Sequence, residues 1–341
     1  MKNIFQRGNL RFTVLLLWDW ALVLVFLRSI QSCRKEKNIY KGCFTMRIGT
    51  NVISLLGSLV LIAGCHPSPG DLKSDAAVGQ GLTIKAMTFN VRVPADSGDK
   101  SWERRRDVAA RVLTSRQPDV VGFQEMVLQQ RDDLLASTKD YAAFGLGREK
   151  DKGGESCTVF YLKQRWDLDQ GQTGTFWYSD TPEEPGSTHW GNKWVRICTW
   201  ARLIDKETGR GFYIYNSHLD FSEDFHLRAG ALLQQRMAQR THMNEPVIVM
   251  GDFNSSPNGK GLAWMLDKER PLALEDAWGL AHPGEDGFSF HNFSGKGKAR
   301  IDYLLCSKGA FSVSRAEVIY DHEGDVWPSD HFPVWAELHF R

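Results

Sequence analysis

Short apolar runs that end in small polar clusters are the feature of this sequence that most constrains its fold. Five such clusters occur, and most of them directly follow a β-branched or aromatic run. They are Thr88-Phe89-Asn90, Gln124-Glu125, Asn216-Ser217-His218, Gly251-Asp252-Phe253-Asn254 and Ser329-Asp330-His331. Residues 247–250 are apolar at every position, so a strand formed there needs cover on both of its faces. The pattern predicts buried strands whose ends bring carboxylate, amide and imidazole groups together.

Eight segments have the composition of strands and are bounded by Gly, Pro, Asn or Asp. They cover residues 83–90, 120–123, 156–162, 195–203, 211–215, 247–250, 300–306 and 332–338. Residues 102–115 and 224–241 instead have apolar side chains at helical spacing. In the first of these helices, we expect Arg104-Arg105-Arg106 to lie mainly on the solvated face. The predicted fold is an α/β, four-layered sandwich in which two packed mixed β-sheets are flanked by helices.

The residues after Met46 have the order of a bacterial export signal. Arg47 is followed by the apolar run 52–62, which is too short to span a bilayer, and then by Ala63-Gly64-Cys65. Residues 46–64 thus resemble a lipoprotein signal peptide, and the resemblance implies cleavage before Cys65 and lipidation of its thiol. An ordinary secretory peptide or a retained anchor helix is the alternative. We interpret residues 1–45 as a gene-start extension or a leader.

Residues 65–80 contain Pro67, Pro69, Gly70 and Gly79, and such a stretch buries little surface. We interpret it as a tether. Residues 81–341 show no second linker and no internal repeat, so we predict one domain there. The expected location is the cell envelope, where a lipid anchor holds the domain at a bacterial membrane on the periplasmic or cell-surface side.

The charge of the domain differs from that of the whole chain. The full sequence has a net charge of +1, but residues 1–64 hold nine basic and two acidic side chains. The remainder has 33 basic and 39 acidic side chains, a net charge of −6. An acidic domain is not typical of proteins that bind long nucleic acids without sequence preference, because those carry a basic surface.

Three cysteines remain once the leader and Cys65 are set aside. Cys157, Cys198 and Cys306 lie in apolar, strand-like segments and lack the spacing of a metal site. Their number is odd, so we expect buried, unpaired thiols.

Two of the polar clusters place pairs of functional side chains on one face of a strand. The period of two aligns Asp252 with Asn254, and Asn216 with His218. An Asp that accepts a proton from water, beside an amide that holds a phosphoryl oxygen, suits a hydrolase. The alternatives are an Asx turn at residues 252–254 and a hydrogen-bonded structural histidine at residue 218.

The other clusters point to a cation and to a general base. Glu125 lies at the end of a predicted buried strand. Burying a carboxylate there costs free energy, unless a cation binds it or solvent reaches it. Asp330 and His331 lead into a hydrophobic strand, and an imidazole held by a carboxylate can act as a base near neutral pH. Asp302 is the candidate partner of His331, because its neighbours make a buried segment.

Taken together, the five clusters resemble the motifs of the endonuclease/exonuclease/phosphatase superfamily, the group with the fold of pancreatic deoxyribonuclease. The resemblance covers residues 82–338 and keeps the motifs in the family's order. It implies Mg²⁺, or Mn²⁺ in some members. It further implies a metal site at Asn90, Glu125 and Asp330, and catalytic roles for His218, Asp252, Asn254, Asp302 and His331.

Further residues are candidates for substrate binding. Arg196 and Arg228 can clamp a phosphate on charge grounds, although surface salt bridges explain them equally well. Asn216 shares a strand face with His218. Trp177, Trp190 and Trp194 can stack on a base or sugar, with core packing as the equal alternative.

The expected function is metal-dependent hydrolysis of a phosphate ester, as a phosphodiesterase or phosphatase, by in-line attack of an activated water. The expected substrate is a phosphorylated small molecule, lipid or nucleotide. We expect a monomer with no obligate protein partner. The alternatives are a secreted nuclease that acts on DNA or RNA, and a non-catalytic surface binding protein on the same fold. The second is disfavoured because no catalytic polar group is missing.

Overall fold

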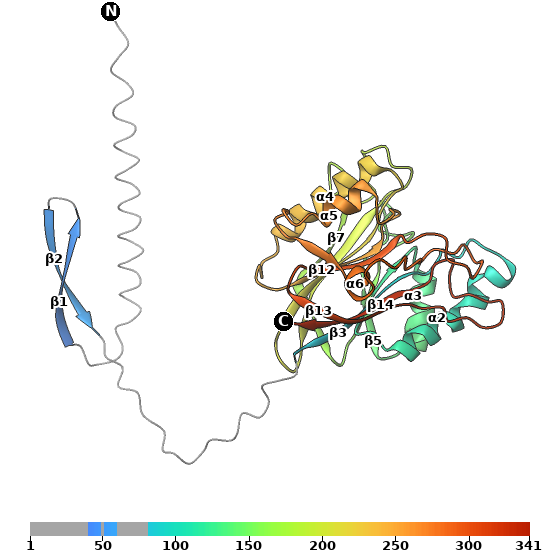
Figure 1. The fold of residues 1–341 in the computed structure, drawn as a ribbon, viewed down its shortest axis with the longest axis horizontal. Helices are drawn as coiled ribbons and strands as arrows, with labels where there is room; N and C mark the ends of the chain where they lie inside the picture. Colours follow the sequence, from blue (N-terminus) through green and yellow to red (C-terminus); the bar gives the residue numbers. More distant parts are fainter. Residues whose placement is uncertain (1–39, 49–50, 60–80) are drawn as a thin grey trace, which may run out of the picture. The chain divides into compact units, whose positions relative to one another are not determined.

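The computed structural model describes residues 40–48, 51–59 and 81–341 (Figure 1). The chain divides into two units, residues 1–78 and 79–341, which are described separately. In the first unit, β1 (Tyr40–Ile48) and β2 (Asn51–Leu59) form an antiparallel pair. Cys65 and the predicted tether lie outside the described residues, so the lipoprotein signal stays a prediction. Within the three described ranges, none of the helices has the length and apolar character needed to cross a bilayer.

The second unit contains two mixed six-stranded sheets. The first has the order β11-β12-β10-β9-β8-β7, with β9 and β10 parallel. Its strands are β7 (Trp166–Trp177), β8 (Ile197–Asp205), β9 (Gly211–His218), β10 (Val247–Asp252), β11 (Leu274–Asp276) and β12 (Asp302–Ser307). The second has the order β13-β14-β3-β4-β6-β5, with β3 and β4 parallel. Its strands are β3 (Thr83–Asn90), β4 (Val120–Gln124), β5 (Tyr141–Phe144), β6 (Val159–Leu162), β13 (Phe311–Val318) and β14 (Val334–Phe340).

The sheets pack on each other through their inner faces. Ile84 and Val120 of one sheet belong to the same buried cluster as Ile214 and Ile248 of the other. Gly122 of β4 permits the close approach, because a Cβ there would come within 2.7 Å of the Asn216 side chain on the opposite sheet. The inner faces therefore form the central core between the two sheets.

Helices cover the outer faces (Figure 1). Val112 of α2 (Trp102–Arg116) and Leu134 of α3 (Leu128–Ser137) pack on the sheet that contains β3. Leu233 of α4 (Glu223–Ala238) and Leu262 of α5 (Lys260–Met265) pack on the sheet that contains β10. Between residues 81 and 341, the remaining helical segments are η1 (Gly98–Lys100) and α6 (Ala277–Ala281). The predicted four-layered α/β sandwich is thus confirmed.

The cysteine prediction is also confirmed, because Cys157, Cys198 and Cys306 are buried and free. The prediction for the arginine run in α2 is wrong at one position. Arg105 is completely buried, whereas the side chains of Arg104 and Arg106 are exposed. Arg105 lies three residues after Trp102, on the buried face of the helix.

Candidate active site

Three of the predicted site residues stand side by side in one sheet. Asp252 ends β10, and the strand register pairs it with His218 on β9 and with Asp302 on β12. Residues opposite each other on neighbouring strands have their Cβ atoms about 5 Å apart. The pairing therefore brings together three groups that lie far apart in the sequence.

The carboxylate of Asp252 is the point on which the site converges. Its Oδ2 accepts a hydrogen bond of 2.9 Å from the Asn90 amide, and lies 3.6 Å from Nε2 of His218 and 3.8 Å from Nε2 of His331. Its Oδ1 accepts a hydrogen bond of 2.9 Å from the backbone N–H of Asn254. The side chain is buried. A buried carboxylate is thus held in one orientation by groups from both sheets.

His331 is held from its other side by Asp302. Nδ1 of His331 lies 2.9 Å from Oδ2 of Asp302, which also accepts a hydrogen bond of 2.6 Å from the Ser289 hydroxyl. Burial acts to lower the pKa of His331, but the carboxylates of Asp302 and Asp252 outweigh it and raise that pKa to about 10. His331 is therefore an imidazolium at neutral pH.

The pKa values of Asp252 and His218 are shifted differently from that of His331. Burial, with the Asp302 carboxylate adding to it, raises the pKa of Asp252 to about 7. Burial and the charge of Arg196 hold the pKa of His218 well below its usual value, so this imidazole is neutral. A cationic imidazole, a neutral imidazole and a carboxylate that titrates near pH 7 thus share one site. Such divergent pKa values mark the acid and base groups of hydrolases.

Asn90 ties the two sheets together at the site. Its amide nitrogen donates to Asp252 and, at 3.1 Å, to Oε1 of Glu125, while its amide oxygen accepts from the backbone N–H of Arg92. An amide oxygen has two lone pairs, so it can accept this bond and still face a cation. Asn90 positions two carboxylates in this structure, and its place in a metal site stays a prediction.

The backbone turns sharply where the strands deliver these groups. Arg92, Glu125 and Asn254 each lie one or two residues beyond the end of a strand and have φ values of 56°, 58° and 48°. Residues other than glycine seldom adopt this left-handed conformation, and the ones that do cluster at functional sites.

Glu125 and Asp330 face the same cavity and form the first candidate cation site. The Arg92 guanidinium lies 3.6 Å from Glu125 and 4.0 Å from Asp330. Burial chiefly, with the charge of Glu125 adding to it, raises the pKa of Asp330. Paired hard oxygen donors are the ligands that Mg²⁺ and Mn²⁺ prefer, so this donor set fits the implied metal.

Asp252, Asp302 and His331 form a second group, with one possible ligand atom from each lying within 4.8 Å of the others. In this group, Nδ1 of His331 and Oδ2 of Asp302 already bind each other, and Asp302 does not line the cavity. Glu125 and Asp330 both line it. We therefore favour the first site for a cation.

The site opens into a cavity of about 630 Å³. Arg196, His218, Asp252, Asn254, Glu125, Asp330 and His331 line it as predicted from the sequence. The prediction missed six further lining residues with polar or aromatic side chains, namely Arg92, Arg148, Glu155, Phe221, Phe290 and Asn292. Arg92 lies two residues beyond the Asn90 cluster, which is the only local signal among them. The others come from loops whose convergence has no sequence signature.

Two predicted substrate residues do not reach the cavity. Asn216 is completely buried, where its amide nitrogen donates to the carbonyl oxygens of Phe123 and Thr158 and its oxygen accepts from Gln124. Its amide therefore bridges the sheets instead of facing substrate. Arg228 is exposed on α4 and is not among the residues that line the cavity.

The three candidate tryptophans lie in different environments. Trp194 lines the cavity, whereas Trp177 is buried and Trp190 packs edge-to-face on Phe225. The alternative of core packing thus holds for two of the three.

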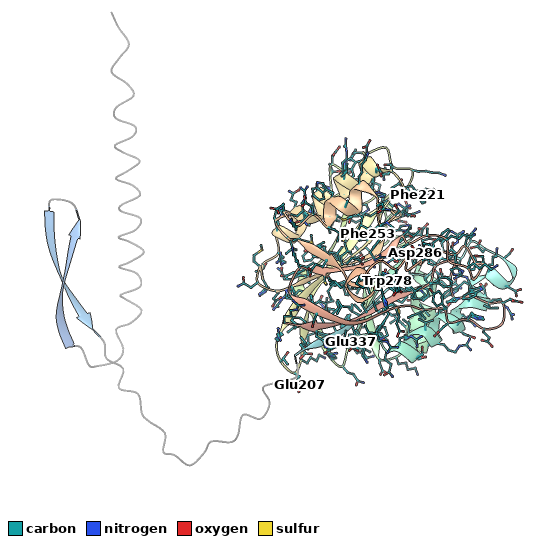
Figure 2. All side chains as sticks on the ribbon, in the orientation of Figure 1. Glu207, Phe221, Phe253, Trp278, Asp286 and Glu337 are labelled. Atoms are coloured by element: carbon teal, nitrogen blue, oxygen red, sulfur yellow. The ribbon has the colours of Figure 1, made fainter. Side chains whose placement is uncertain are left out.

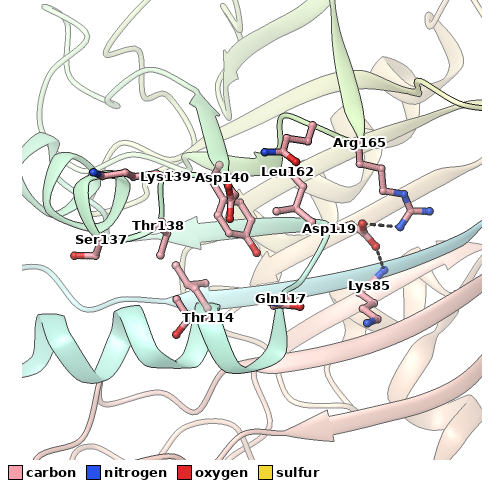
Figure 3. A pocket seen from close by; sticks show the side chains of 13 residues that line it. Lys85, Thr114, Gln117, Asp119, Ser137, Thr138, Lys139, Asp140, Leu162 and Arg165 are labelled. Carbon is pink, nitrogen blue, oxygen red and sulfur yellow. Dashed lines mark hydrogen bonds and ion pairs between the residues drawn. The ribbon is translucent and has the colours of Figure 1, made fainter.

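A second cavity, of about 560 Å³, lies near the opposite ends of β3 and β4 (Figure 3). Its central carboxylate, Asp119, accepts hydrogen bonds from the Arg165 guanidinium at 2.6 Å and from the Lys85 backbone N–H at 2.8 Å. That carboxylate is fully paired, and none of the predicted catalytic residues lines this cavity.

Comparison with known proteins agrees with this geometry. Among curated relatives, a protein of Acanthamoeba polyphaga mimivirus is 26% identical over 45% of this chain, and mouse Nocturnin is 25% identical over 80% of it. The chain spans 59% of the viral protein and 68% of Nocturnin.

Among solved structures, an endonuclease/exonuclease/phosphatase family protein of Bacteroides thetaiotaomicron is 29% identical, with a TM-score of 0.70 over 77% of this chain and 96% of its own. A mannosyl-6-phosphatase of the same organism is 29% identical, with a TM-score of 0.69 over 75% of this chain and all of its own. The profile of the Endonuclease/Exonuclease/phosphatase family matches residues 87–331, well over half of the sequence. The chain therefore belongs to the endonuclease/exonuclease/phosphatase family.

Proposed function

We propose that the protein hydrolyses a phosphate ester by direct attack of a water molecule that Asp252 activates. The observation that carries the proposal is the convergence of Asn90, His218 and His331 on Oδ2 of Asp252. A carboxylate with a pKa of about 7 is a suitable base at neutral pH.

Other residues of the site protonate the leaving group and bind the phosphoryl oxygens. Asp252 accepts a proton as the water oxygen bonds to phosphorus, and the protonated His331, held by Asp302, donates a proton to the departing oxygen. Arg196 and the neutral His218 line the same cavity and can donate hydrogen bonds to the phosphoryl oxygens. Asn254 donates one amide hydrogen to the Leu219 carbonyl and keeps a second for the same purpose.

Glu125 and Asp330 are the side chains that would hold a divalent cation. Such a cation supplies charge neutralisation to the phosphoryl or leaving oxygen when it is bound. The two carboxylates line the cavity beside Asp252, so their position supports this assignment.

Two observations support a small substrate over a long nucleic acid. The cavity of about 630 Å³ matches the size of a small-molecule site, and residues 65–341 carry a net charge of −6. The structural similarity to a mannosyl-6-phosphatase also supports a small phosphate ester.

The test is a hydrolysis assay with mono- and bis-nitrophenyl phosphate, DNA and RNA, with Mg²⁺ and with EDTA. We expect Mg²⁺-dependent turnover of a nitrophenyl ester and a loss of about 10²–10⁴-fold in kcat for Asp252→Asn, because the general base is removed. The melting temperature of the variant checks its fold. Near-normal turnover by Asp252→Asn refutes the mechanism, and preferred cleavage of DNA or RNA favours the nuclease alternative.

We further propose that a lipid on Cys65 holds the protein at a bacterial envelope membrane. The support is the order of residues 46–65 in the sequence. Metabolic labelling with a radioactive fatty acid in a bacterial host tests it. We expect label on the full chain and none on Cys65→Ser, whereas equal labelling of both proteins contradicts the proposal.

A further inference from the structure

We propose that the mouth of the catalytic cavity is a subsite for a sugar ring, so that the substrate is a sugar phosphate. The subsite consists of Trp194, Phe221 and the Arg148–Glu155 ion pair. The proposal rests on the proposed function, and it adds the group that carries the phosphate.

The Trp194 and Phe221 rings form an aromatic corner at the mouth of the cavity. Phe221 lies in the loop between β9 and α4 at the surface (Figure 2), with 61% of its area exposed. Its ring centre lies 5.9 Å from that of Trp194, and the two rings meet at 69°. Both side chains line the cavity. Exposed aromatic surface beside a catalytic centre is typical of a binding face.

Arg196 connects this corner to the phosphate. The guanidinium carbon of Arg196 lies 5.5 Å from the centre of a Trp194 ring. Arg196 is only 4% exposed, its Nε has no hydrogen-bond partner, and its nearest carboxylate oxygen, on Asp220, is 3.7 Å away. A buried guanidinium left this poorly paired is ready to accept an anion. A phosphate held there places its organic group against the aromatic corner.

A polar pair lies beside the corner. The two terminal nitrogens of Arg148 donate to the two carboxylate oxygens of Glu155 at 2.7 and 2.8 Å, and both residues line the cavity. A guanidinium donor beside a carboxylate acceptor matches adjacent hydroxyl groups, each of which can donate and accept.

These features favour a saturated ring over a nucleobase. A base offers two flat faces, and its usual binding partner is a parallel aromatic ring. The Trp194 and Phe221 rings are strongly inclined, so they form a corner and not a slot. A sugar presents C–H groups to such a corner and hydroxyl groups to the ion pair.

The experiment compares four substrates: a hexose 6-phosphate, glycerol 3-phosphate, a nucleoside 5′-monophosphate and nitrophenyl phosphate. The main variant is Phe221→Ala, and Glu155→Gln is a second variant that acts on the polar pair. The matched control is Met243→Ala, which removes an apolar side chain that is 51% exposed and does not line the catalytic cavity.

We expect the wild type to prefer the hexose phosphate. In Phe221→Ala, the KM for hexose phosphate should rise roughly two- to tenfold, the range expected for one aromatic contact, with little change in kcat. Glu155→Gln should raise the same KM, and neither variant should affect glycerol 3-phosphate. Met243→Ala should match the wild type throughout.

Three outcomes would each overturn the sugar subsite. They are an equal rise in the KM for glycerol 3-phosphate in the two variants, a larger rise in the KM for the nucleotide, and a wild type that does not prefer the hexose phosphate. In these three cases turnover of nitrophenyl phosphate shows that the proposed function stands. If the wild type hydrolyses none of the four esters, the proposed function fails and the subsite fails with it.

Discussion

At the residue scale, the chemistry of the site depends on which charge state each buried group holds. Asp302 acts on two members of this network, although it does not line the cavity. Its charge adds to the raised pKa of Asp252. It stabilises the imidazolium form of His331, and its own orientation is fixed by the Ser289 hydroxyl. Asp302 is therefore a positioning residue whose effect is transmitted through His331 and Asp252.

The first prediction concerns this pair. In Asp302→Asn, the pKa of His331 should fall, because the largest contribution that raises it is removed. Hydrolysis should slow by up to about 10²–10⁴-fold, since the general acid loses the carboxylate that holds it and favours its protonated form. NMR titration of the His331 ring protons measures the pKa, and kcat measures the effect on turnover.

Asp286→Asn is the matched control, because Asp286 is exposed on the surface (Figure 2). It should change neither quantity. A His331 pKa that stays near 10 in Asp302→Asn would show that Asp302 does not set the charge of the imidazole.

At the scale of secondary structure, the strands divide into two classes. The eight strands predicted from composition are the eight interior strands of the two sheets, although several of their ends are shifted. The four edge strands β5, β7, β11 and β13 were all missed. An edge strand is covered less completely, so its composition is more polar, as the mostly exposed or half-buried pattern of β7 shows. Burial on two faces is what made a strand recognisable.

Helix α2 connects the fold to the site through one side chain. The Arg105 guanidinium donates to the carbonyl oxygens of Val91, Arg92, Lys100 and Pro328 at 2.7–3.0 Å. These carbonyls belong to the loops that precede and follow the catalytic groups. Arg105 therefore holds the loop after β3 against the segment that leads into Asp330 and His331.

The second prediction is that Arg105→Met destabilises the protein by about 3 kcal/mol or more, because four carbonyl groups lose their buried partner. Arg104→Met, one position away on the exposed face, should change the free energy of unfolding by less than about 0.5 kcal/mol. Denaturant unfolding of both variants provides the comparison. Equal stability of the two variants would mean that the buried contacts of Arg105 contribute nothing.

At the scale of the whole molecule, the site exists only because two sheets meet. Asp252, His218 and Asp302 come from one sheet, and Asn90 and Glu125 come from the strand ends of the other. Burial chiefly, with repulsion between neighbouring carboxylates adding to it, raises the pKa values of Asp252 and Asp330 at this junction. A divalent cation would relieve that repulsion and should bind the folded state preferentially.

The third prediction follows from this linkage. Saturating Mg²⁺ should raise the melting temperature of the wild type, since a ligand at 100 times its Kd stabilises the folded state by about 2.7 kcal/mol. Glu125→Gln should lose most of this rise, and EDTA should abolish both the rise and the turnover. Calorimetric melting with and without Mg²⁺ is the measurement. An unchanged Mg²⁺ effect in Glu125→Gln would exclude that carboxylate as a ligand.

The sequence by itself determined the interior strands, the buried thiols and the strand ends that carry Asp252, Asp302 and His331. These features depend on burial and on a period of two, which are local properties of the chain. Only the tertiary structure decided that Asn216 bridges the sheets, that Arg228 stays outside the cavity, and that Arg148, Glu155 and Phe221 reach it. Those outcomes depend on how strands pair and how loops converge. Such contacts join residues far apart in the sequence, so no local pattern records them.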